Sequence, residues 1–179
     1  MALNLRLFNA TGRLAKDRRG ATAVEFGLLA LPFFAIVLAT VETGMVFLAS
    51  ETLETAVATT SRLLRTGQAQ QQNMDVNAFK TQICNVAGAL FDCSKIAIDV
   101  KTYSAFDTIS LAAPLDGQGN LDTSTFSYSA GHGGDIVLVR AYYEWPTVTH
   151  LLGFSLANEG NGSYLMGAAS AFRNEPFPW

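Results

Sequence analysis

Residues 18–67 read RRGATAVEFGLLALPFFAIVLATVETGMVFLASETLETAVATTSRLLRTG, and their pattern predicts one long helix. Residues 26–41 carry no charge, and apolar residues continue on both sides of them. This apolar length suffices to cross about 30 Å of hydrocarbon at a helical rise of about 1.5 Å per residue. We therefore expect the first half of the helix to span a membrane and the second half to carry a folded domain outside it.

The charges on either side of the apolar run predict its orientation. Residues 1–20 hold five basic residues against one acid, a net charge of +4, and no Lys or Arg follows until Arg62. Such a basic flank stays in the cytoplasm because its charges would have to be desolvated to cross. A conventional secretory signal is the alternative, but Glu42 lies across the expected cut in LATVETG, which is a poor match.

Two residues are unusual within the apolar run, Glu25 and Pro32. Pro32 removes a helix hydrogen bond and should bend the helix, which membrane helices tolerate. An acid in a membrane costs roughly 2.5–3.5 kcal/mol at the centre and less near the interface. Glu25 therefore either lies at the headgroup boundary, or it pairs with a positive charge that the uncut chain lacks. A cut after Gly20 would create such a charge, because the Ala21 amine, with a reference pKa of about 8, would lie one helical turn from Glu25. A neighbouring copy or a related subunit could also supply the positive charge.

The residues around this acid resemble a known processing motif. Basic residues, Gly20, four further residues beginning with Ala21, and then Glu25 and Phe26 are similar to the type IV prepilin cleavage motif. The rest of the chain looks like the TadE-like branch of the tight-adherence (Flp/Tad) pilus system. The positions that carry this wider resemblance are Pro32, Glu42-Thr43-Gly44, Phe47, Tyr143-Glu144-Trp145-Pro146 and the tail from Phe172 to Phe177.

The resemblance implies a role in pilus assembly. A membrane prepilin peptidase would cut after Gly20, making Ala21 the mature N-terminus and Glu25 the acid at mature position five. The product would be a minor pilin or pseudopilin in the bacterial inner membrane, with a cytoplasmic N-terminus and a periplasmic C-terminal domain. Its implied partners are the peptidase, other pilins and pseudopilins that contact its long helix, and the Tad assembly platform. An uncleaved single-pass anchor that carries a periplasmic binding or assembly module is the alternative.

These observations divide the chain into a leader at 1–20, a membrane segment at 21–49 and a periplasmic domain at 50–179. The helix within that domain is expected to have a polar and an apolar face. The polar sector contains Glu51, Glu54, Thr55, Ala58, Arg62 and Arg65. The opposite, core-facing sector contains Met45, Ala49, Leu53, Ala56, Val57, Thr60, Leu63 and Leu64.

A second helix is expected after the first one ends. Gly67 is a plausible C-cap, and residues 68–74 read as a polar loop. Residues 76–91 have apolar residues at helical spacing, with Asp75 in position to cap their N-terminus.

The chain has two cysteines, Cys84 and Cys93, which lie nine residues apart around the end of this second helix. In an oxidising compartment we expect them to form a disulfide. Zinc is a weaker alternative, since the spacing is unusual and His132 and His150 are distant in sequence. A catalytic cysteine is weaker still.

Three strands are expected in the remaining chain, at 95–103, 135–145 and 163–172. In the first strand Ile96, Ile98 and Val100 alternate with polar residues, as in a strand with one solvent-facing side. Residues 104–134 read as a long loop or short hairpin, 148–152 as a helical turn, and the aromatic tail as a segment that folds back or faces a partner. The fold class is therefore α+β and pilin-like, with an antiparallel sheet whose edge needs cover or a partner.

Composition argues against several other functions. Residues 21–179 hold seven basic against fourteen acidic residues, a net charge of −7, which disfavours a nucleic-acid surface. The sequence shows no glycine-rich phosphate loop and no paired-acid motif, so we expect neither an enzyme nor a cofactor or metal site. His132 lies among glycines and is expected to be solvated.

Overall fold

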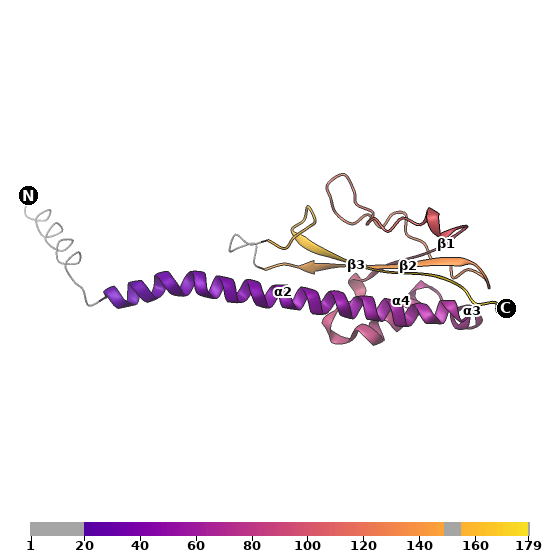
Figure 1. Ribbon diagram of the computed structural model, residues 1–179, viewed down its shortest axis with the longest axis horizontal. Helices are drawn as coiled ribbons and strands as arrows, with labels where there is room; N and C mark the ends of the chain where they lie inside the picture. Colours follow the sequence, from indigo (N-terminus) through magenta and orange to yellow (C-terminus); the bar gives the residue numbers. More distant parts are fainter. Residues whose placement is uncertain (1–19, 149–154, 179) are drawn as a thin grey trace, which may run out of the picture. The chain divides into compact units, whose positions relative to one another are not determined.

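The computed structural model describes residues 20–148 and 155–178. The chain divides into two compact units, one ending at Thr40 and the other beginning at Val41. Helix α2, Ala21–Arg65, runs through both without interruption, and Pro32 lies inside it (Figure 1). The predicted single long helix is therefore confirmed; the bend at Pro32 stays a prediction.

Helix α2 ends where a glycine adopts a left-handed conformation. Gly67 has φ of 76°, which confirms its predicted capping role. The following residues form a short helix, α3, Gln68–Gln71, so the expectation of a loop at 68–74 was wrong there. Ala69 is 1% exposed, and its burial orders a segment that its polar composition assigned to a loop.

Helix α4, Val76–Ala87, begins at the predicted cap. The Ala78 N–H donates to Asp75 Oδ1 at 2.7 Å. The helix was predicted to continue to 91, but Gly88, with φ of 69°, ends it. Two short 3₁₀ turns follow, η1 at Gly88–Leu90 and η2 at Cys93–Lys95, so the next strand begins two residues later than predicted.

The sheet has three antiparallel strands in the order β1-β2-β3. They are β1, Ala97–Tyr103, β2, Ile136–Pro146, and β3, Ser163–Arg173. The predicted α+β architecture is confirmed. Residues 104–134 contain one further 3₁₀ turn, η3, Phe106–Thr108, and are otherwise irregular, as predicted. The helical turn expected at 148–152 falls mainly outside the described residues.

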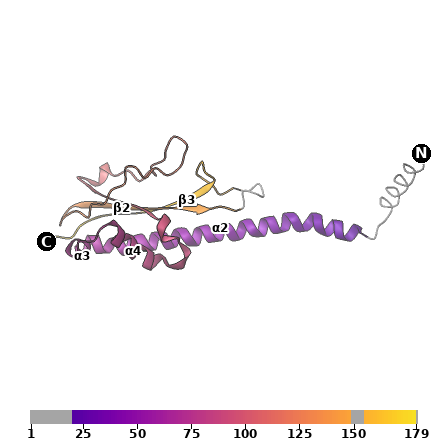
Figure 2. The same ribbon diagram turned by 180° about the vertical axis from the view of Figure 1, so that it is seen from behind.

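The core of the second unit lies between the helices and one face of the sheet. Figures 1 and 2 show the second half of α2 and α4 on one side of the sheet and residues 104–134 on the other. Helix side chains and the strand residues that alternate toward them form one cluster. It includes Leu53, Val57 and Leu64 of α2, Phe79 and Ile83 of α4, and Val100, Val137, Val139 and Met166 of the sheet.

The C-terminal tail folds back onto the domain. The Glu175 N–H donates to the Arg65 carbonyl at 2.8 Å, and Arg65 Nε lies 3.7 Å from Glu175 Oε1. Asn174 Nδ2 donates to the carbonyls of Ala130 and His132 at 3.1 and 3.0 Å. The tail therefore ties the end of α2 to the loop that precedes β2.

Asp99 occupies an unexpected environment. Its alternation with Ile98 and Val100 predicted a solvent-facing side chain, yet it is 1% exposed. Residues 104–134 fold over this second face of the sheet, and Asp99 Oδ2 pairs there with Arg140 Nη2 at 2.6 Å. The sheet is therefore covered on both faces.

Candidate functional site

The first turn of α2 presents the Gly20–Ala21 peptide bond at the helix start. The Gly20 carbonyl accepts the first helical hydrogen bond, from the Val24 N–H at 3.1 Å, and Ala21 is the first helical residue. Both residues are exposed. The bond that the motif marks for cutting therefore lies at the boundary between the helix and the chain before it.

Gly20 has no structural requirement for glycine among the described residues. A Cβ atom added at Gly20 would meet no atom within 4 Å, and Gly20 does not have a positive φ. The described chain therefore imposes no requirement for glycine at this position, as at Gly27 and Gly44.

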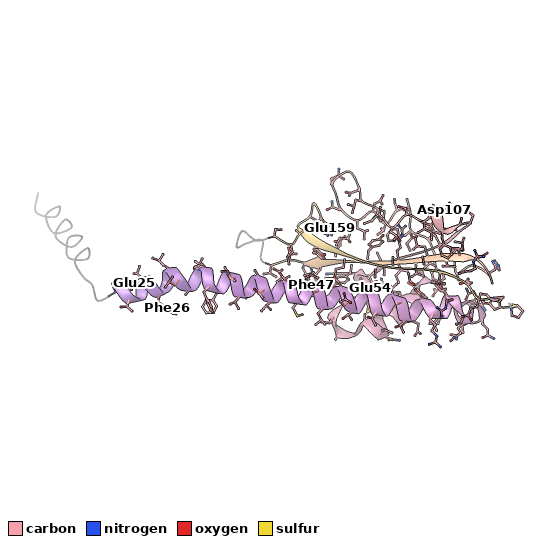
Figure 3. The ribbon with its side chains drawn as sticks, in the orientation of Figure 1. Glu25, Phe26, Phe47, Glu54, Asp107 and Glu159 are labelled. Carbon is pink, nitrogen blue, oxygen red and sulfur yellow. A yellow bond between two sulfur atoms is a disulfide. The ribbon has the colours of Figure 1, made fainter. Side chains whose placement is uncertain are left out.

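Glu25 and Phe26 lie next to each other near the start of α2 (Figure 3). Phe26 is 70% exposed, and Glu25 is exposed as well. Within residues 20–148 and 155–178, no side chain forms an ion pair or hydrogen bond with Glu25. Its proposed pairing with the Ala21 amine or a neighbouring subunit stays a prediction.

The first half of α2 is apolar on every side. The Thr40 hydroxyl in it is satisfied locally, since Thr40 Oγ1 donates to the Ile36 carbonyl at 2.8 Å. Among the described helices, α2 is the one that is long and apolar enough to cross a membrane. Its exposed apolar side chains, each at least half exposed, are Val24, Phe26, Leu28, Leu29, Leu31, Phe33, Phe34, Ile36, Leu38, Val41, Phe47 and Leu48.

The predicted faces of the second half of α2 are largely confirmed. Every residue assigned to its polar sector is exposed, and Ala49, Leu53, Ala56, Val57, Thr60 and Leu64 of the apolar sector are buried. Met45 was placed in the buried sector, but it is 38% exposed. The cluster of core residues begins at the next residue, Val46.

Glu42 connects α2 to the segment that follows β2. Its Oε1 accepts a hydrogen bond from the Val148 N–H at 2.5 Å, across 106 residues of sequence. In the sequence, Glu42 was noted as part of the TadE-like resemblance and as making a poor signal-cleavage site, but no structural contact was predicted for it. An acid at the end of an apolar run needs a hydrogen-bond donor, which is a signal that could have predicted this contact.

The cysteine pair forms the predicted disulfide. Cys84 near the end of α4 is joined to Cys93 at the start of η2, with their Cα atoms 5.9 Å apart. Asp92 beside it accepts hydrogen bonds from the Ser94 Oγ and N–H at 2.6 and 3.0 Å, which lower the pKa of the Asp92 carboxyl. The covalent link therefore fixes the turn between α4 and β1.

The two histidines lie apart from this arrangement. The His132 side chain is 91% exposed, with Nδ1 3.7 Å from Asp135 Oδ2, and His150 lies outside the described residues. In the part of the chain that the structure describes, no group of three His, Cys, Asp or Glu side chains is arranged to hold a metal ion.

These features define a class of protein with an apolar N-terminal helix that continues into the core of a small disulfide-linked α+β domain. Residues 20–62 match the family model of TadE-like proteins. The match begins at Gly20 and follows α2 almost to its end, so it confirms the resemblance over these residues. No curated protein and no solved structure matches the chain.

Proposed function

We propose that this protein is a minor pilin or pseudopilin that a prepilin peptidase cuts after Gly20 and that acts in assembly of a Tad adhesion pilus. The observation that carries the proposal is the position of Gly20. It immediately precedes the apolar helix, lies five residues before Glu25, and is not required by the packing of the described chain.

Cutting would give Glu25 a partner. The new Ala21 amine would lie one helical turn from the Glu25 carboxylate, and it would be mostly protonated at neutral pH. A neighbouring subunit supplies the other candidate cation. Either pairing would lower the cost of placing an exposed acid in an apolar helix.

The exposed surface of α2 supports the proposed partners. In a bacterial inner membrane, with residues 1–20 in the cytoplasm and the domain in the periplasm, this surface would face lipid or the helices of other pilins. Gly27 and Gly44 lie on the same helix, and a Cβ at either would meet nothing within 4 Å. Small residues with such open surroundings allow a second helix to approach closely. Contacts with the peptidase and the Tad assembly platform would follow from the same placement.

Intact mass and N-terminal sequencing of the protein from its native membrane test the cut. We expect a start at Ala21 that depends on the peptidase. Gly20→Val should block the cut, whereas Gly27→Val, which changes another glycine with open surroundings, should leave it unchanged. A chain that still starts at Met1 beside active peptidase would contradict the proposal and favour the uncleaved periplasmic module.

Glu25→Gln separates cutting from assembly. The amide keeps the shape of the side chain but removes its charge, so we expect a normal start at Ala21 together with loss of the protein's activity in pilus assembly. Counting surface pili in a strain that carries this variant measures the effect. Normal piliation would show that Glu25 needs no charged partner.

A further inference from the structure

The two edge strands of the sheet, β1 and β3, differ in whether another segment hydrogen-bonds to their outer backbone groups. Along β1, the Val100 N–H donates to the Ser127 carbonyl and its carbonyl accepts from the Ser129 N–H, both at 2.8 Å, so residues 127–129 cover this edge. On the other edge, β2 is the one strand among the described residues that pairs with β3. Natural sheets protect such edges with charges, proline, bulges or covering segments.

The hydrogen bonds of Leu165 show which backbone groups face outward. The Leu165 N–H donates to Asn158 Oδ1 at 2.6 Å, and its carbonyl accepts from Asn158 Nδ2 at 3.3 Å. The backbone N–H and C=O groups of Leu165 therefore point away from β2. Because these groups alternate in direction along a strand, those of Gly167, Ala169 and Ala171 point away from β2 as well. The backbone groups of these three residues form no hydrogen bond within the described chain.

The same edge borders an apolar hollow. A space of about 230 Å³ is lined on the sheet side by Leu165, Gly167 and Ala169 and on the loop side by Leu111 and Leu115. Gly167 and Ala169 are exposed and lack bulky side chains. Side chains of a strand added beside β3 that point to the loop side would therefore lie next to the hollow.

A charge marks the far end of the free edge. Arg173, the last residue of β3, is exposed, and no residue among those described pairs with its guanidinium. On a strand added antiparallel to β3, the residue opposite Arg173 is the first residue of that strand, because Arg173 is the last residue of β3. A carboxylate at that position would complement it, as opposite charges do across paired strands.

We propose that the free edge of β3 binds an extended segment of a partner protein as a fourth, antiparallel strand. The segment has an acidic residue opposite Arg173 and bulky apolar residues opposite Ala169 and Gly167, facing the hollow. Backbone hydrogen bonds to Gly167, Ala169 and Ala171 would supply affinity, and the hollow and Arg173 would supply specificity.

A second copy of the chain fits this edge poorly, by an argument that rests on the membrane anchoring proposed above. Figures 1 and 2 show β3 running lengthwise along the second half of α2. Antiparallel pairing of β3 with β3 would reverse one copy. The second halves of the two α2 helices would then run in opposite directions, which does not suit two copies anchored from the same side of one membrane.

A designed peptide tests the proposal on the full chain in detergent micelles. The fluorescent peptide ETVTLTL places Glu opposite Arg173 and its leucines opposite Ala169 and Gly167, and fluorescence anisotropy measures its binding. We expect saturable binding that is lost when the amide of the first leucine is N-methylated, because that N–H bonds to β3. Ala169→Pro should also abolish binding, since proline is tolerated at an outward edge position but removes the donor.

A charge exchange supplies the matched control. Arg173→Glu should weaken ETVTLTL binding by about fivefold and strengthen binding of KTVTLTL by a similar factor. Retention of the Cys84–Cys93 disulfide and of tryptophan fluorescence checks that each variant folds. Absence of saturable binding, or binding unaffected by N-methylation, would overturn the proposal. Disulfide-linked dimers of Ala169→Cys in native membranes would also overturn it, because they would show that a second copy of the chain lies on this edge. The start of the mature chain is measured separately, so failure here leaves the cut after Gly20 unaffected.

Discussion

Asp99 and Arg140 are paired across β1 and β2 on the sheet face opposite α2, with Asp99 Oδ2 2.6 Å from Arg140 Nη2. Each of them also holds the covering loop. Asp99 Oδ1 accepts the Ser127 N–H at 2.9 Å, and Arg140 Nη1 donates to the Ser110 and Ala112 carbonyls at 3.4 and 3.3 Å. One buried ion pair therefore fastens both ends of the long loop to the sheet.

Replacing one member of this pair should be strongly destabilising. Arg140→Met leaves the Asp99 carboxylate buried without its main partner, and we expect a loss of about 3–5 kcal/mol in the free energy of unfolding. Urea denaturation followed by tryptophan fluorescence measures it. Lys101→Met, which removes a partly exposed cation 3.3 Å from Asp99, should cost about 1 kcal/mol or less. Equal costs for the two variants would contradict a central role for Arg140.

The disulfide should stabilise the domain through the short loop that it closes. Cys84→Ser is expected to lower the free energy of unfolding by about 2–3 kcal/mol on the chain-entropy account. Reduction of the wild-type protein should cost a similar amount, and the Cys84→Ser/Cys93→Ser double variant no more than the single one. A double variant as stable as the oxidised wild type would show that the link contributes nothing to stability.

Glu159 should make stability depend on pH. The side chain is 8% exposed, its Oε1 accepts the Leu121 N–H at 2.9 Å, and burial raises the pKa of its carboxyl. The folded state therefore holds the proton of the Glu159 carboxyl more tightly than the unfolded state does. The contribution of Glu159 to stability is greatest below the unfolded pKa and falls as pH rises through the folded pKa.

Glu159→Gln removes that dependence while a carbonyl still accepts the Leu121 N–H. We expect a melting temperature about 2 °C above wild type at pH 7, with the difference vanishing near pH 4. Differential scanning fluorimetry at both pH values measures it. Glu54→Gln changes an exposed acid of α2 and should show no such difference. A Glu159→Gln variant less stable at pH 7 would mean that the charged form is the stabilising one.

Tyr128 should stabilise the fold through the packing of its ring and not through its hydroxyl. Burial raises the pKa of Tyr128 to about 12, and its hydroxyl is buried with no partner among the described residues. Tyr128→Phe is therefore expected to be neutral or to stabilise by about 1 kcal/mol. Tyr128→Ala should cost about 3 kcal/mol, since the ring packs on Phe79 with centroids 5.8 Å apart. Urea denaturation of both variants distinguishes the two contributions.

Local signals predicted most of the fold. The uncharged run after Glu25, the Asp75 cap and Gly67 depend on neighbouring residues, and they correctly predicted the long helix α2, its end and the start of α4. The end of α4 was predicted at residue 91, four residues beyond its last residue, Ala87. The three strands were predicted within two residues at each end because apolar runs and Pro146 delimit them.

Contacts between distant residues account for what the sequence reading missed. Asp99 looked solvent-facing because nothing near it in sequence shows that residues 104–134 return to cover it. An arginine inside the apolar strand IVLVRAYYEW was the available signal, since a buried charge requires a partner. The contact between Glu42 and Val148 depends in the same way on how distant segments come together. An edge in need of cover was predicted, but which of the two edges is covered depends on the contacts of residues 127–129 with β1.

The continuity of α2 also has a mechanical consequence. Ala49, Leu53, Val57 and Leu64 place the same helix in the core over about four turns. A force applied along α2 from its N-terminal end would load these contacts together in shear, instead of separating them one after another. The domain should therefore resist extraction along its helix far better than it would resist peeling of the sheet from the side.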